Sequence, residues 1–166
     1  MNEPRRPTEN PRPPPERVTP GPARAAEHVV RVPCVADRVE LLNRAIHTAN
    51  EDPGTSWSIV LQPGCAYTVA QPYGGVNGLE AVTGNIRIGS PGPETAVVDR
   101  SPSVDTAAFR ILEVEQRGRL VIDRLTIRNG ATGSGGGVLT TTDTLITANT
   151  PDDCAGSRPP VPHCAG

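Results

Sequence analysis

The sequence predicts an all-β fold, a right-handed parallel β-helix or solenoid of about three to four coils with an N-terminal capping α-helix. After Gly54, short apolar runs follow one another, each closed by Gly, Pro, Asn or Asp. Such runs are too short for helices and too closely spaced for alternating strands and helices. Ile127 and Ile146 recur in similar settings about one coil apart, as do Ile88 and Ile111. That recurrence is expected if aliphatic side chains stack in columns.

A β-sandwich is the alternative all-β fold. It would be expected to show hairpin signals and buried aromatic side chains in its core. Aromatic residues make up 2% of the chain, and Asn77-Gly78 is a dipeptide that could turn a hairpin. The scarcity of aromatic residues favours a core of stacked aliphatic side chains, and therefore the solenoid.

The composition divides the chain into an arm and one domain. Residues 1–33 are expected to form a disordered arm rich in Pro and Arg, because almost no large apolar side chain precedes Val29. Residues 34–166 are expected to form the β-helix domain. Within the domain we expect the capping helix at 35–50, the coils at 55–150 and a disulfide-closed tail at 151–166.

The segment 35–50 is the one convincing helix of the sequence. Its apolar residues recur at steps of three and four, which is the pattern of a helix with one buried face. These residues are Val39, Leu42, Ile46 and Ala49. Asp37 is expected to be the N-cap and Glu40 to complete a capping box. Pro53 and Gly54 then end the helix.

Four cysteines, Cys34, Cys65, Cys154 and Cys164, allow three pairings. We favour two disulfides, Cys34 to Cys65 and Cys154 to Cys164. No pair has the C-x-x-C spacing of a zinc knuckle, so no metal site is expected there. Disulfides indicate an oxidising compartment, and we expect a secreted or cell-surface protein, although the chain shows no signal peptide at its start.

The charge and hydropathy of the chain exclude two classes of partner. The formal net charge is −2, whereas a nucleic-acid binder normally has a strongly basic face. No apolar run approaches the roughly 20 residues that cross a bilayer, so no membrane span is expected. The glycine runs Gly74-Gly75 and 135–137 lack the Lys-Ser or Lys-Thr of a phosphate loop, and they predict tight corners between strands.

Several segments in their order resemble a known family. They are LLNRAIHTAN, PGTSWSIVLQPGCAYTV, NGLEAVTGNIRIGS, AFRILEVEQRGRLVIDRLTIRNG, GSGGGV and ITANTPDDC. Together they resemble the right-handed parallel β-helix repeat proteins of actinobacteria, in the pectate-lyase-like superfamily. The resemblance implies a helix that plugs the open end of the stack and a secreted or surface location. The single GGG turn and the short segment after it indicate a short or truncated member.

The resemblance also directs attention to charged residues on the outside of the strands. Polysaccharide lyases of this fold hold calcium with clustered carboxylates and use an Arg or Lys as base. The corresponding candidates are Asp99, Arg110, Asp123 and Arg128. Calcium needs six to eight oxygen ligands, and only two carboxylates fall on neighbouring coils. The simpler interpretation is that these are solvated charges that alternate with core aliphatic residues, so we expect no catalytic residue, metal or cofactor. We assign the four residues to binding.

Other reactive groups are isolated. Asp152-Asp153 is the one adjacent pair of acids that could suit a hydrolase, and it lies in the tail. His47 is expected to be a surface histidine without ligand-type neighbours. Trp57 and Tyr73 could stack on a sugar ring, although aromatic residues near a rim more often complete the edge of a core.

These observations lead to three functional hypotheses. The first is a non-enzymatic secreted or cell-surface β-helix protein that presents a flat polar face to a polysaccharide or to another surface protein. The second is a polysaccharide lyase or glycoside hydrolase of the same fold. The third is a truncated relic without function. The sequence does not specify an oligomeric state.

Overall fold

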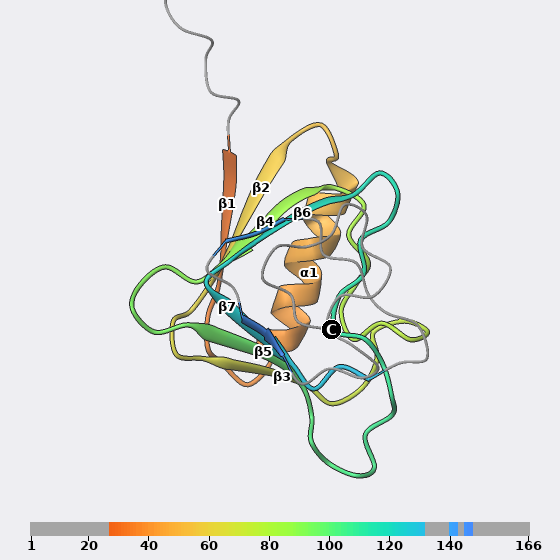
Figure 1. Ribbon diagram of the computed structural model, residues 1–166. Helices are drawn as coiled ribbons and strands as arrows, with labels where there is room; N and C mark the ends of the chain where they lie inside the picture. Colours follow the sequence, from red (N-terminus) through yellow and green to blue (C-terminus); the bar gives the residue numbers. More distant parts are fainter. Residues whose placement is uncertain (1–26, 132–139, 143–144, 148–166) are drawn as a thin grey trace, which may run out of the picture.

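Two parallel β-sheets and one α-helix make up residues 27–131, 140–142 and 145–147, the part of the chain that the computed structural model describes (Figure 1). The first sheet has the order β1-β2-β4-β6-β8 and the second the order β3-β5-β7-β9. The strands of the first sheet are Glu27–Val32 (β1), Ser56–Leu61 (β2), Asn85–Gly89 (β4), Arg119–Asp123 (β6) and Thr140–Thr142 (β8). Those of the second sheet are Ala66–Val69 (β3), Ala96–Arg100 (β5), Leu125–Arg128 (β7) and Leu145–Thr147 (β9).

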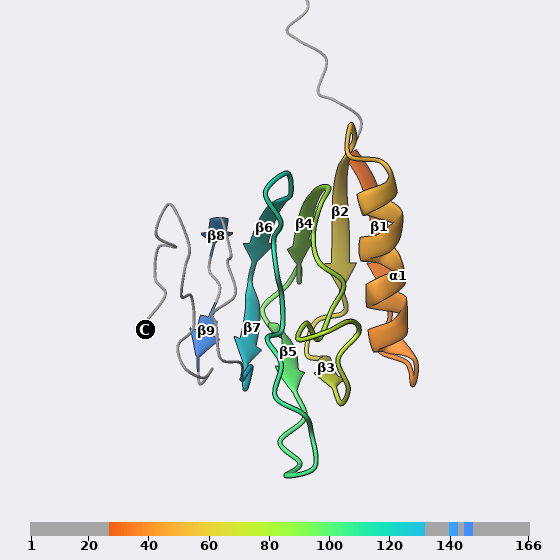
Figure 2. The same ribbon diagram turned by 90° about the vertical axis from the view of Figure 1, so that its right-hand side faces the viewer.

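From β2 onward the chain alternates between the two sheets. Each strand pairs in parallel with the strand two places along the chain, so β2 pairs with β4 and β3 with β5. Figure 2 shows the strands of both sheets following one another along the molecule, with the helix at the β1 end. The prediction of a β-rich chain with parallel strands is confirmed.

The predicted all-β, right-handed parallel β-helix is wrong. The described residues form a mixed α/β arrangement of two separate parallel sheets and a 14-residue helix, α1, and no closed solenoid is found among them. Between the sheets the chain makes isolated bridges, such as Val82 with Val114, in place of a third sheet. The segment that would have to supply such strands contains Gly74, Gly75 and Gly78, and glycine weakens a strand.

The core consists of aliphatic side chains in register across the strands. In the first sheet Ile59, Ile88 and Ile122 are successive Cα partners, and all three are almost completely buried. The predicted alignment of Ile127 with Ile146 is confirmed, because the two residues are Cα partners in β7 and β9.

The alignment of Ile88 with Ile111 is wrong. Ile88 has Ile59 and Ile122 as its neighbours, and Ile111 is buried in the irregular segment, where its carbonyl accepts a hydrogen bond from Leu79 N. The connections between strands differ in length, so a similar local pattern in the sequence does not fix the register.

Strand β1 falls in a segment that we expected to belong to the disordered arm, residues 1–33. Its residues pair in parallel with β2, which places Val30 beside Ile59 and Val32 beside Leu61. The alternation of buried and exposed residues in EHVVRV is short, and its first three residues are exposed. The polar composition of the arm therefore gave no indication of a strand here. The remainder of the predicted arm and the tail at 151–166 lie outside the described residues.

Helix α1, Arg38–Glu51, begins three residues later than expected and ends one residue later. The predicted apolar face is confirmed by the burial of Leu42, Ile46 and Ala49, and α1 packs against β1, β2, β3 and β4. The capping box is wrong, because the side chain of Asp37 makes no capping hydrogen bond. Its backbone, at φ −94° and ψ 24°, lacks the extended conformation that normally directs an N-cap side chain toward the first turn.

Close backbone approach explains a glycine at the entry to β6. A Cβ atom on Gly118 would overlap the carbonyl oxygen of Val82 in the preceding connection. A Cβ atom on Gly54 would have Asp52 Oδ1 as its nearest neighbour, at 3.9 Å. Neither glycine has a positive φ. The two positions therefore differ in the room available for a Cβ atom, and neither requires the left-handed backbone conformation that favours glycine.

We therefore expect Gly118→Ala to lower the free energy of unfolding by about 1–3 kcal/mol, because the added methyl group must displace backbone. Gly54→Ala is the matched control, and its effect should be neutral or stabilising by up to about 1 kcal/mol. Urea unfolding of both variants measures the difference. Equal stability of the two variants would contradict the close packing at Gly118.

Candidate functional site

Two of the four predicted binding residues form a pair on the second sheet. Asp99 in β5 and Arg128 in β7 are Cα partners, and both Nε and Nη2 of Arg128 lie 3.3 Å from Asp99 Oδ2. The residue Asp99 is 5% exposed. Its charge is therefore balanced by Arg128, and it is not the solvated charge that the sequence suggested.

The other two predicted residues lie elsewhere. Asp123 ends β6 in the first sheet, and its Oδ2 accepts a hydrogen bond of 2.6 Å from Nη2 of Arg87 in β4. Arg110 lies in the irregular segment before β6, where its Nη1 is 3.3 Å from Glu113 Oε1. Asp123 Oδ1 also lies 3.5 Å from Arg124 Nε, so the four residues take part in four ion pairs at three separate places. Only Asp99 and Arg128 are brought together.

This pairing limits what the carboxylates can do. Arg128 engages Oδ2 of Asp99 and Arg87 engages Oδ2 of Asp123, so one oxygen of each carboxylate is held by a guanidinium. Among residues 27–131, 140–142 and 145–147, no three His, Cys, Asp or Glu side chains converge in a way that could hold a metal ion. The same residues contain no helix of the length and apolar character needed to span a bilayer.

A groove of about 460 Å³ runs between the first half of α1 and the segment that follows β3. Its polar side chains come from both walls. They are Arg38, Glu40 and Asn43 from α1 and Thr68, Gln71 and Tyr73 from the opposite wall. The volume falls in the range of small-ligand sites.

Tyr73 is the exposed aromatic residue at this groove, with 54% of its surface accessible. A tight turn fixes its backbone, since Tyr73 N donates to Asn77 O at 2.8 Å and Gly74 pairs with Asn77 in an antiparallel bridge. The predicted corner is confirmed here, because Gly75 has φ +59°. A hydrogen bond to the Glu80 carboxylate and the negative charge of that group raise the pKa of the Tyr73 hydroxyl.

Polar residues of α1 fasten this wall to the helix. Asn43 Oδ1 accepts a hydrogen bond from Glu80 N at 2.9 Å. Asn50 Oδ1 accepts from Thr83 N at 2.9 Å and from Gly84 N at 3.0 Å, while its Nδ2 donates to the carbonyl of Ala81. Two side-chain amides thus bind four backbone groups of 80–84, while Val82 pairs with the backbone of Glu113 and Glu115.

His47 lies on the same face of α1 as Asn43 and Asn50. As predicted it is exposed, but it has partners that the sequence did not reveal: Nδ1 is 3.0 Å from Glu80 Oε1, and Nε2 is 3.7 Å from Glu51 Oε1. The hydrogen bond to Glu80 and the negative charges of Glu80 and Glu51 raise the pKa of His47 above 6.5. His47 therefore links the helix electrostatically to the wall that carries Tyr73.

Sequence reasoning missed Asn43, Asn50 and Glu80. One signal was present: Asn43, His47 and Asn50 have the spacing of a single helix face, beside the apolar stripe. Trp57, considered with Tyr73 as a sugar-stacking residue, instead packs against the core. Its ring lies edge-on to that of His28, with the ring centroids 4.8 Å apart.

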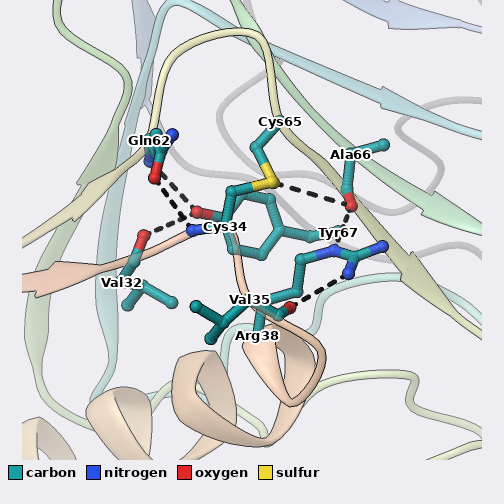
Figure 3. The surroundings of a disulfide bond; sticks show 8 residues. All are labelled: Val32, Cys34, Val35, Arg38, Gln62, Cys65, Ala66 and Tyr67. Atoms are coloured by element: carbon teal, nitrogen blue, oxygen red, sulfur yellow. Dashed lines mark hydrogen bonds between the residues drawn. A yellow bond between two sulfur atoms is a disulfide. The ribbon is translucent and has the colours of Figure 1, made fainter.

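The predicted disulfide between Cys34 and Cys65 is confirmed (Figure 3). It joins the connection between β1 and α1 to the corner before β3, with a Cα–Cα distance of 5.8 Å. Beside it the buried Tyr67 hydroxyl donates to Val32 O at 2.6 Å and accepts from Gln62 N at 3.0 Å. A disulfide is consistent with an extracellular location. The predicted pair Cys154 and Cys164 lies outside the described residues.

Arg38 ties the start of α1 to the same corner. Its Nε donates to Ala66 O at 2.5 Å and its Nη1 to Val35 O at 3.0 Å (Figure 3). The disulfide and Arg38 together hold one end of the groove.

Removal of this disulfide should destabilise the protein. The bridge spans 31 residues of sequence, and closing a loop of that length stabilises a fold by about 3–4 kcal/mol in the chain-entropy model. We expect the double variant Cys34→Ser, Cys65→Ala to lose about this much free energy of unfolding in urea. Adding a reducing agent to the variant reveals any contribution of the remaining cysteines. Unchanged stability of the variant would contradict a structural role of the bridge.

The ion pairs of His47 should give a pH-dependent contribution to stability. Because the pKa is higher in the folded state, the contribution is fully present below the unfolded-state pKa of about 6.5 and is lost as the pH rises through the raised folded-state value. NMR titration should give a His47 pKa above 6.5 in the wild type and a value closer to 6.5 in Glu80→Gln. Glu51→Gln should have the smaller effect. An unchanged His47 pKa in Glu80→Gln would refute the pairing.

Comparison with known proteins adds no relative to this description. Neither a protein-family model, nor a curated protein, nor a solved structure matches this chain. Nothing in these comparisons identifies the chain as a β-helix repeat protein.

Proposed function

We propose that this protein is a non-enzymatic, extracellular glycan-binding protein and that the groove beside Tyr73 is its binding site. The observation that carries the proposal is the exposed ring of Tyr73 on a hydrogen-bonded turn at a polar groove. An aromatic face offers apolar area to the C–H face of a sugar ring, and its low flexibility reduces the entropy lost on binding.

Both walls supply polar groups that suit sugar hydroxyls. Glu40 on the α1 wall and Gln71 on the wall of Tyr73 are exposed, and Thr68 lies in the groove with them. A carboxylate accepts hydrogen bonds, an amide both donates and accepts, and a hydroxyl does either, so the set can match hydroxyl groups in several orientations.

Binding without turnover is supported by the state of the acidic residues. A lyase or hydrolase of carbohydrate needs a convergent set of carboxylates or a carboxylate with a perturbed pKa. Asp99 and Asp123 are held by Arg128 and Arg87 on different sheets. The extracellular part of the proposal rests on the Cys34–Cys65 disulfide.

The proposal predicts that Tyr73 dominates the affinity for oligosaccharides. Calorimetric titration with a panel of soluble oligosaccharides should identify a ligand whose affinity falls about tenfold or more in Tyr73→Ala, a loss of ~1.4 kcal/mol or more. Tyr73→Phe retains the ring and should stay within about threefold of the wild type. Val104→Ala is the control for an exposed apolar side chain outside the groove, and it should have no effect.

Two results would count against the proposal. One is an affinity that is equal in the wild type and in Tyr73→Ala. The other is release of a shortened or unsaturated oligosaccharide during prolonged incubation, because turnover would contradict binding alone. Loss of such a product in Arg110→Ala or Arg128→Ala would instead support an enzyme that uses the residues expected from the sequence.

A further inference from the structure

We infer that the groove selects uncharged oligosaccharides and discriminates against acidic ones such as uronic-acid polymers. This inference rests on the proposed function and adds the class of ligand. The argument depends on the charges that surround the groove and on which of them are already engaged.

The single cationic side chain of the groove lining, Arg38, is committed to the protein. Its Nε and Nη1 donate to the carbonyl oxygens of Ala66 and Val35, which fixes the guanidinium against the wall. A carboxylate ligand is best held by two parallel N–H groups of one guanidinium. With Nε and Nη1 both occupied, Arg38 lacks the free bidentate edge that runs from Nε, so it contributes charge without that mode of recognition.

Negative charges lie in the groove and next to it. Glu40 is exposed on the helix wall. Glu80 lies outside the lining, and its carboxylate interacts with the Tyr73 hydroxyl, whose pKa it raises. His47 partly balances Glu80, but its second nitrogen faces Glu51, another acid. An acidic sugar seated on the Tyr73 ring would therefore approach more negative than positive charge.

The positive end of the α1 dipole does not reverse this balance. The first turn of α1 and the residue before it carry Asp37 and Glu40, which are acidic and exposed. Carboxylates in these positions offset the partial positive charge of a helix N-terminus. Neutral hydroxyl groups remain the complementary ligand, since they can donate to Glu40 and exchange hydrogen bonds with Gln71.

The test compares neutral and acidic oligosaccharides of equal length by calorimetric titration at low salt, with gluco-, manno- and xylo-oligosaccharides against oligogalacturonides. Two like charges about 5 Å apart in water repel enough to weaken binding about fourfold. We expect a neutral ligand to bind at least fourfold more tightly than its acidic counterparts. Glu40→Gln and added salt should both narrow this difference.

Glu115→Gln is the matched control. Glu115 is an exposed carboxylate that lines a separate depression near the end of α1, and its removal should leave the ratio of affinities unchanged. A ratio that narrows equally in Glu40→Gln and Glu115→Gln would overturn the inference, because the discrimination would then come from net charge and not from the groove.

The remaining outcomes separate the inference from the proposed function. Acidic oligosaccharides that bind as tightly as neutral ones, or more tightly, with both affinities lost in Tyr73→Ala, would overturn the inference and leave the proposed function intact. Absence of binding by either class, or affinities that are insensitive to Tyr73→Ala, would overturn both.

Discussion

In-register parallel pairing is the constraint on which the rest of this structure depends. Each backbone step along a strand fixes which side chain lies next to it on the neighbouring strand, about 4.8 Å away. On the inner side this places Ile59, Ile88 and Ile122 in one line, where each buries the next. Because apolar area removed from water is the main favourable term in folding, the hydrophobic gain accumulates along these lines.

The same register also determines which charged side chains on the outer side of the sheets become neighbours. Asp99 and Arg128 are opposite each other on adjacent strands, so the pair forms as a direct consequence of the alignment that buries their apolar neighbours. In the first sheet, Asp123 of β6 accepts a hydrogen bond from Arg87 of the neighbouring strand β4. The candidate charges are therefore distributed over the two sheets and the irregular segment before β6, and each of them is paired with an opposite charge.

The end of the stack requires a different solution, because a sheet edge exposes backbone groups that need partners. Here α1 packs against the first strands. The side-chain amides of Asn43 and Asn50 form hydrogen bonds with four backbone groups of 80–84. The Cys34–Cys65 disulfide and Arg38 hold the helix in this position. The groove that displays Tyr73 lies between the first half of α1 and the segment that follows β3. The proposed binding site therefore forms where the helix packs against the strands.

The sequence by itself determined the features that depend on local pattern. The apolar stripe located α1, the short runs closed by Gly, Pro, Asn or Asp indicated parallel strands, and the cysteines allowed the bridge between Cys34 and Cys65. It did not determine that the strands of the described chain form two separate sheets. Gly74, Gly75 and Gly78 lie in a connection that would have had to supply further strands, and glycine weakens a strand.

Only the tertiary structure decided the register of Ile88 with Ile122, the inclusion of β1, the separation of Asp99 from Asp123, and the meeting of His47 with Glu80. Each of these relations joins residues across connections of unequal length. Periodicity within a segment carries no information about such distances, and packing of the whole chain sets them.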